Sequence, residues 1–214
     1  METATIPGID LNVSRIGLGT WAIGGWLWGG ADDRESIRTI HAALDKGINL
    51  LDSAPVYGFG HSEEIVGQAI AQLGCRDKVI IATKVGLQWS KGLVLRNASR
   101  ARILKEVDDS LRRLQTSYID IYQVHWPDPR IPVEETAEAM NQLYREGKIR
   151  AIGVTTIRRP IWSGSVRLRP CISTSLRITF LNVEAKVMFF LTSAKITSLH
   201  SLTAACVAAC SVEG

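Results

Sequence analysis

Residues 47–58 read GINLLDSAPVYG, a short apolar run that follows a glycine and ends in an aspartate before a turn. Gly47 stands where a preceding helix would stop, and residues 48–52 have the length and composition of a buried strand. The turn after Asp52 is short enough to fold the Tyr57 phenol back over the end of that strand. The segment therefore predicts a strand with an ionisable side chain at its carboxyl end and a phenol above it.

The same pattern recurs along the chain as far as residue 157. Short β-branched runs begin at intervals of 30 to 40 residues, near Ile16, Ile48, Val79, Ile119 and Ile149. An amphipathic helix is expected in each gap, over about residues 32–47, 62–74, 103–114 and 132–147. Strand–helix–strand units of about 30 residues predict right-handed crossovers and a parallel sheet.

Two α/β architectures fit this alternation, an open doubly wound sheet and a closed (βα)₈ barrel. The polar residues at the strand ends favour the barrel. Asp52, Lys84 and His125 follow three consecutive strands at their carboxyl ends. In a barrel all three side chains point into one mouth, which is where barrel enzymes place catalytic groups. We therefore expect a (βα)₈ TIM barrel.

Tyr57, Lys84, Asp52 and His125 together form a set of groups suited to carbonyl reduction. Lys84 would stabilise the tyrosinate and lower the pKa of Tyr57, while Asp52 would hold Lys84 charged and oriented. His125 could position a carbonyl oxygen so that Tyr57 protonates it as the carbon accepts a hydride. Taken singly, a buried ion pair or a core histidine is the commoner explanation; the four together favour a catalytic site.

Four separated motifs resemble the aldo-keto reductase signatures over about residues 5–157. They are GINLLDSAPVYG at 47–58, IATK at 81–84, the stretch from Ser110-Leu111 to Tyr118-Ile119-Asp120, and HWPD at 125–128. The opening IGLGTW at 16–21 and GGWLWGG at 24–30 look like the bacterial general-stress and inositol-operon branch of that family.

The resemblance implies a TIM barrel with an N-terminal hairpin over its base and NADP(H) bound without a Rossmann fold. It implies Asp52, Tyr57, Lys84 and His125 as the catalytic tetrad. It also implies contacts to the cofactor from Thr20, Trp21, Asp52, Thr155 and Thr156. The family's Ser-Asn pair after the fifth strand is here Thr155-Thr156, which lacks the asparagine amide.

Four tryptophans follow the first and fourth strands. Trp21, Trp26, Trp28 and Trp126 could wall an apolar substrate pocket, with packing on the barrel rim as the alternative.

Composition limits the partners that we expect. The net charge of +4 comes from residues 158–214, whereas the chain through Ile157 holds 18 Lys and Arg against 19 Asp and Glu. No basic patch on the main body indicates nucleic acid, and no apolar run of membrane-spanning length or signal peptide is visible. The four cysteines match no familiar zinc spacing, so no metal is expected. These features predict a cytoplasmic protein that acts on a small carbonyl compound.

The composition changes at residue 157. The 57 residues beyond it hold three of the four cysteines and no aspartate. Three more βα units would need about 90 residues, and a whole barrel about 250. We therefore expect an incomplete barrel at 1–157 and an atypical tail at 158–214, either frameshifted or replaced.

The tail has two alternative interpretations, a diverged closing segment or a piece that dimerises to complete the barrel. Unpaired sheet edges would invite self-association, and loss of cofactor contacts would impair the reductase. A non-catalytic aldo-keto-like binding or regulatory subunit, or an inactive truncated product, is the alternative function.

Overall fold

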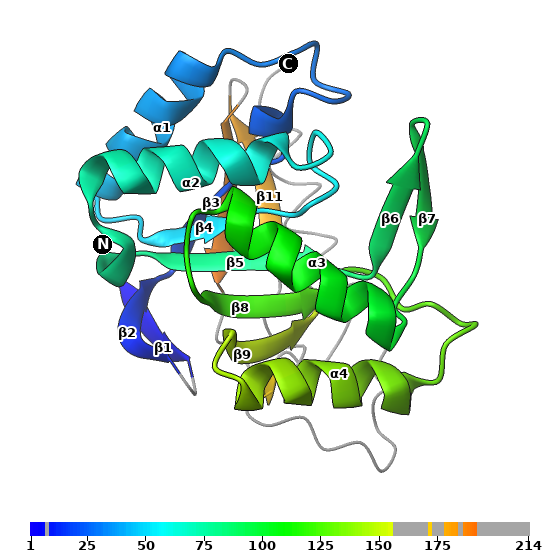
Figure 1. The fold of residues 1–214 in the computed structure, drawn as a ribbon. Coiled ribbons are helices and arrows are strands. Elements are labelled where there is room, and N and C mark those ends of the chain that lie inside the picture. The colour runs from blue at the N-terminus through cyan, green and yellow to red at the C-terminus, as the bar shows by residue number, and fades with distance from the viewer. Residues whose placement is uncertain (7–8, 156–170, 173–177, 184–185, 192–214) are drawn as a thin grey trace, which may run out of the picture.

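A computed structural model describes residues 1–6, 9–155, 171–172, 178–183 and 186–191. At its centre is a parallel sheet whose strands follow chain order, as Figure 1 shows. These strands are β3 (Ile16–Gly19), β4 (Leu50–Asp52), β5 (Ile80–Val85), β8 (Ile119–Val124) and β9 (Ile149–Val154). The expected parallel sheet and its five strands are confirmed.

One α-helix lies in each gap between these strands. The helices are α1 (Asp33–Asp45), α2 (His61–Leu73), α3 (Arg100–Arg113) and α4 (Val133–Arg145). Asp32 caps α1 by accepting a hydrogen bond from the Glu35 amide, and Gly74 ends α2 in a left-handed conformation. Within the described residues, no helix combines the length and the apolar character that a bilayer crossing needs.

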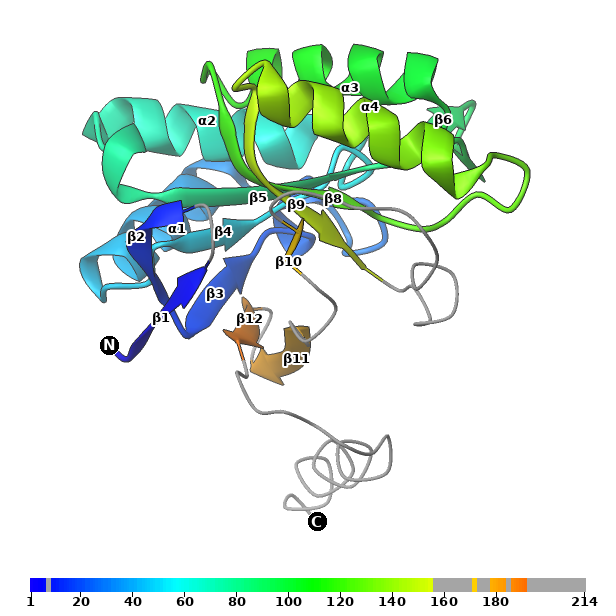
Figure 2. The same ribbon diagram turned by 90° about the horizontal axis from the view of Figure 1, so that it is seen from below.

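The helices and the N-terminal hairpin cover opposite faces of the parallel strands. Figure 2 shows α2, α3 and α4 on one side of the sheet. On the other side, β1 (Thr3–Ile6) and β2 (Ile9–Ser14) pair antiparallel. Their Ile6, Ile9 and Val13 pack against inward-facing residues of four strands, Leu50, Ile80, Ala82, Ile121 and Ala151. The hairpin thus closes the end of the barrel opposite the predicted mouth.

A second hairpin was not predicted. It comprises β6 (Leu87–Ser90) and β7 (Leu93–Arg96), follows β5 directly, and projects from the body in Figure 1.

The edges of the parallel sheet differ from our expectation. We expected both edges to be open, but β12 (Lys186–Leu191) pairs antiparallel with β3, and β10 (Cys171–Ile172) pairs with β9. A further strand, β11 (Ile178–Val183), pairs with β12. The runs ITFLNV and KVMFFL are rich in β-branched and aromatic residues, so they supply strand-forming segments that the sequence analysis missed. Because barrel strands are all parallel, the antiparallel β12 departs from barrel order.

Candidate active site

Strand alternation brings the predicted polar residues to one face. On β5, Ile80 and Ala82 contact the N-terminal hairpin cluster, and Lys84 is the next residue of that parity. Asp52 ends β4 and is in register with Ala82, which precedes Lys84 by two residues on β5. Both side chains therefore lie on the inner face of the sheet, at the carboxyl ends of their strands.

Asp52 and Lys84 form a buried ion pair. The Lys84 Nζ donates to Asp52 Oδ2 at 2.7 Å and to the Ser53 carbonyl at 2.7 Å. Burial disfavours the ammonium form, but the Asp52 carboxylate and the Tyr57 hydroxyl outweigh this penalty and raise the pKa of Lys84. Lys84 is therefore a fixed positive charge at neutral pH.

Tyr57 lies beside this charge. Its hydroxyl oxygen is 3.3 Å from Lys84 Nζ, as the sequence predicted. The expected net effect on its acidity is wrong, however. Burial raises the pKa of Tyr57, and the Lys84 charge lowers it by less than burial raises it. The phenol is consequently a protonated donor at neutral pH, and Lys84 offsets part of the cost of its ionisation.

A close backbone contact fixes the Tyr57 loop. Gly58 has a φ of +64°, and a Cβ there would lie 2.1 Å from the Gly24 carbonyl oxygen. A Cβ on Gly24 would in turn lie 2.5 Å from the Tyr57 carbonyl carbon. The loops after β3 and β4 can approach this closely because both contacting residues, Gly24 and Gly58, lack a Cβ.

His125 completes the cluster. It follows β8, and its amide donates to the Val85 carbonyl at 2.8 Å. Its ring lies edge-on to Tyr57 with centroids 6.1 Å apart. Burial, reinforced by the Lys84 charge, lowers the pKa of His125 to about 3. The imidazole is therefore neutral at pH 7 and can donate one N–H. All four predicted catalytic residues are brought together.

Sequence analysis missed three polar side chains near Asp52. Gln123 Nε2 donates to Asp52 Oδ1 at 3.3 Å. Gln123 precedes His125 by two residues on an inward-facing position of β8, a signal that alternation could have supplied. Ser53 and Ser62, both fully buried, lie with their hydroxyl oxygens 3.1 Å apart.

The residues predicted to bind the cofactor occupy different environments. Thr20 is fully buried and donates its hydroxyl to the Asp52 carbonyl at 3.1 Å. Trp21 is half-buried and stacks on Tyr57 with ring centroids 6.0 Å apart. Thr155 donates its hydroxyl to the His125 carbonyl at 2.5 Å. Thr156 lies outside the described residues. The role of these residues in cofactor binding stays a prediction.

The tryptophans divide between the two interpretations. Trp21 and Trp126 border the tetrad, through Tyr57 and His125 respectively. Trp28 packs edge-on against Trp21, whereas Trp26 packs on Phe59, and both Trp26 and Phe59 pack against the buried cluster that includes Tyr57. Two tryptophans thus flank the mouth and two support its rim.

Comparison with known proteins agrees with this geometry. The family model described as "Aldo/keto reductase family" matches residues 15–163. The chain belongs to this family. The parallel sheet, the helix layer and the structural relatives identify the fold as an incomplete TIM barrel of aldo-keto reductase type.

Two curated relatives share high identity with this family member. Aldo-keto reductase YhdN of Bacillus subtilis is 63% identical over 155 residues, which are 72% of this chain and 47% of the relative. The NADH-specific methylglyoxal reductase of Escherichia coli is 47% identical over 73% of this chain and 52% of the relative. The chain spans about half the length of the curated relatives it matches.

Solved structures show the same likeness. A glycerol dehydrogenase from Gluconobacter oxydans matches with a TM-score of 0.69 and 54% identity, covering 74% of this chain and 50% of that one. An aldo/keto reductase from Klebsiella pneumoniae in complex with NADP and acetate matches with a TM-score of 0.60 and 38% identity, covering 72% and 49%.

Proposed function

We propose that this aldo-keto reductase uses NADP(H) to reduce aldehyde or ketone carbonyls to alcohols, with Tyr57 as the proton donor. One observation supports the proposal above the others: a buried phenol lies 3.3 Å from a lysine that is itself held by a carboxylate at 2.7 Å. A protonated phenol beside a fixed cation is suited to give its proton to an oxygen that gains negative charge.

Each of the four clustered residues has a distinct part in this reaction. The phenol hydrogen of Tyr57 passes to the substrate oxygen, and the charge left on the phenolate is stabilised by Lys84. Asp52 keeps Lys84 charged and directed at Tyr57. Neutral His125 donates an N–H to the substrate oxygen and orients it. The tryptophans at the mouth restrict water beside the reacting carbonyl.

A reduced nicotinamide is the hydride source that this donor set needs, because none of the four side chains can supply a hydride. Trp21 and Thr155 border the tetrad and are the predicted residues placed to hold the nicotinamide end. The sequence resemblance and the NADP bound in the Klebsiella structure support the choice of NADP(H) in this proposal. The Escherichia coli relative is named as NADH-specific, so both cofactors belong in the test.

The test is turnover of a generic aldehyde by the full chain, followed by nicotinamide absorbance with NADPH and with NADH. We expect slow reduction that prefers NADPH and is lost in Tyr57→Phe. Reduction that survives Tyr57→Phe would contradict the proton-donor role, and a preference for NADH would contradict the cofactor assignment.

Impaired cofactor binding is part of the proposal, because Thr155-Thr156 stands where the family has a Ser-Asn pair and lacks the asparagine amide. Cofactor binding without turnover would support the alternative, a non-catalytic binding or regulatory role. The cytoplasmic location, the division at residue 157 and self-association through sheet edges stay predictions. Because β12 and β10 cover the edges of β3 and β9, self-association through sheet edges would involve β10 and β11, the outer strands of the sheet in the described residues.

A further inference from the structure

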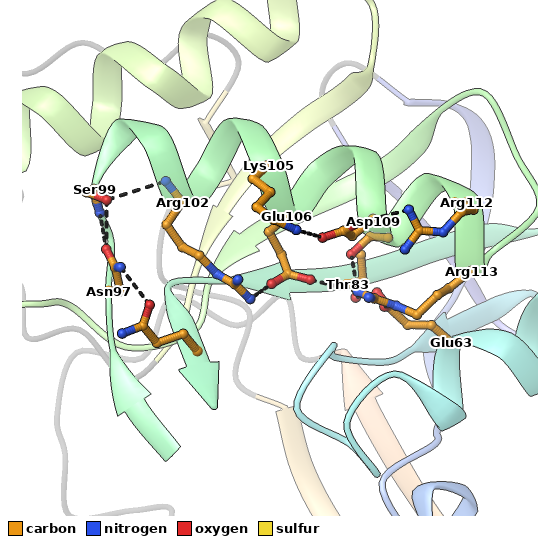
Figure 3. Close-up of polar contacts among 12 residues, drawn as sticks. Glu63, Thr83, Asn97, Ser99, Arg102, Lys105, Glu106, Asp109, Arg112 and Arg113 are labelled. Atoms are coloured by element: carbon orange, nitrogen blue, oxygen red, sulfur yellow. Dashed lines mark hydrogen bonds and ion pairs between the residues drawn. The ribbon is translucent and has the colours of Figure 1, made fainter. Parts of the chain in front are cut away.

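A buried hydrogen bond lies directly behind the tetrad, on the opposite face of β5. Thr83 precedes Lys84, so their side chains point to opposite sides of the strand. Thr83 Oγ1 donates to Glu63 Oε1 at 2.6 Å, and both residues are fully buried. Figure 3 shows Thr83 and Glu63 side by side below α3. Contacts that hold the Glu63 side chain in place therefore also hold, through Thr83, the segment of β5 that carries Lys84.

Glu63 is also tied to the loop that carries Tyr57. It lies in the first turn of α2, which begins three residues after Gly58. The Ser62 amide donates to the Tyr57 carbonyl at 3.2 Å, and the Ser62 hydroxyl donates to the Thr20 carbonyl at 2.8 Å. The first turn of α2 is therefore hydrogen-bonded directly to the Tyr57 backbone. The Glu63–Thr83 contact links it to β5.

Arg113 of α3 prevents Glu63 from turning away. Its Nε donates to Glu63 Oε2 at 2.6 Å, and its Nη2 donates to Glu106 Oε1 at 2.7 Å. A Cβ on Gly60 would lie 2.8 Å from Arg113 Cδ, so the arginine stem packs tightly on the residue before α2. Each carboxylate oxygen of Glu63 therefore accepts a hydrogen bond, Oε2 from Arg113 of α3 and Oε1 from Thr83 of β5, as Figure 3 shows.

We propose that the Glu63–Thr83 hydrogen bond is a positioning contact that sets the approach of the Tyr57 hydroxyl to Lys84. The inference rests on the proposed reductase function, because it assigns a purpose to that approach. Neither residue touches the reacting groups. Each acts through its neighbour, Thr83 through Lys84 and Glu63 through the α2 turn. A displacement of about 1 Å between reacting groups can cost up to about a hundredfold in rate.

The experiment compares three single substitutions in the full chain. Thr83→Val removes the hydroxyl at nearly constant volume, and Thr83→Ser keeps it. Thr136→Val is the matched control, because Thr136 is also buried and its hydroxyl donates to the Ala98 carbonyl at 2.8 Å, but it lies on α4 and this bond involves none of the residues that hold Glu63. Thr83→Ala serves as a second hydroxyl-free variant if Thr83→Val does not fold.

The first measurement is kcat and KM for a generic aldehyde. We expect Thr83→Val to lower kcat about tenfold with KM changed less than twofold, and Thr83→Ser to restore kcat to within twofold. Thr136→Val should leave both constants within twofold. Equal kcat losses in Thr83→Val and Thr136→Val would overturn the proposal, because loss of any buried threonine hydroxyl bond would then have the same effect.

The second measurement needs no turnover. The chain is labelled with 3-fluorotyrosine, and the fluorine resonance of Tyr57 is assigned by its loss in Tyr57→Phe. We expect this resonance to shift or broaden in Thr83→Val and to stay unchanged in Thr83→Ser and Thr136→Val. An unchanged resonance in Thr83→Val would overturn the positioning role. If the unsubstituted chain reduces no carbonyl, the proposed function fails, and the fluorine spectra alone decide whether the contact positions Tyr57.

Discussion

Lys84→Met should destabilise the fold strongly, because it leaves a carboxylate buried without its cation. Asp52 is 1% exposed, and after the substitution Gln123 Nε2 at 3.3 Å is its remaining side-chain donor within the described part of the chain. Breaking a buried ion pair by removing one partner costs about 3–5 kcal/mol. We expect a loss of that size in the free energy of unfolding at pH 7, together with loss of carbonyl reduction.

Urea unfolding followed by tryptophan fluorescence measures this loss. The Asp52→Asn/Lys84→Met double variant removes both charges and should be destabilised by about 2–3 kcal/mol less than the sum of the single losses. A loss below about 1 kcal/mol in Lys84→Met, or additive losses in the double variant, would refute the buried-pair reasoning.

Three further predictions follow from the site geometry. His125 has a pKa of about 3 when folded and about 6.5 when unfolded. The free energy of unfolding should therefore fall as pH decreases from about 6.5 towards 3, by at most about 1.4 kcal/mol per pH unit from this group. A His125→Gln variant with the same dependence of unfolding free energy on pH would contradict this. Gly58→Ala should destabilise the chain more than Gly74→Ala, because both glycines have positive φ but only the Cβ at residue 58 meets the Gly24 carbonyl; equal unfolding midpoints would show that the loop contact is dispensable. In fluorescence titrations, NADPH should bind with a Kd well above the micromolar range, whereas micromolar binding by a monomer would show that the chain forms a complete cofactor site.

The positions of the strands and helices could be read from the sequence because they depend on local patterns. Period-two and period-3.6 hydrophobicity, the Asp32 cap and the Gly74 stop act within a few residues of chain. The tetrad was also predictable, since residues at the carboxyl ends of successive parallel strands must meet at one mouth.

The β-strands between residues 171 and 191 were not predicted from sequence. The tail lacks the strand–helix alternation that identified the earlier units, so only pairing with β3 and β9 shows where its segments lie. The runs ITFLNV and KVMFFL have a strand-forming composition, but composition alone does not say which sheet edge a segment pairs with. Sequence analysis therefore predicted open edges that the structure pairs.

The sequence by itself determined the order of the βα units, the inward placement of Asp52 and Lys84, and the chemistry available at the mouth. Only the tertiary structure decided that burial outweighs Lys84 and raises the pKa of Tyr57. It alone revealed the contact of Gly24 with Gly58 and the link from Glu63 to Thr83. The physical reason is that desolvation and close contact depend on which distant segments are packed together, and a local pattern carries no record of that packing.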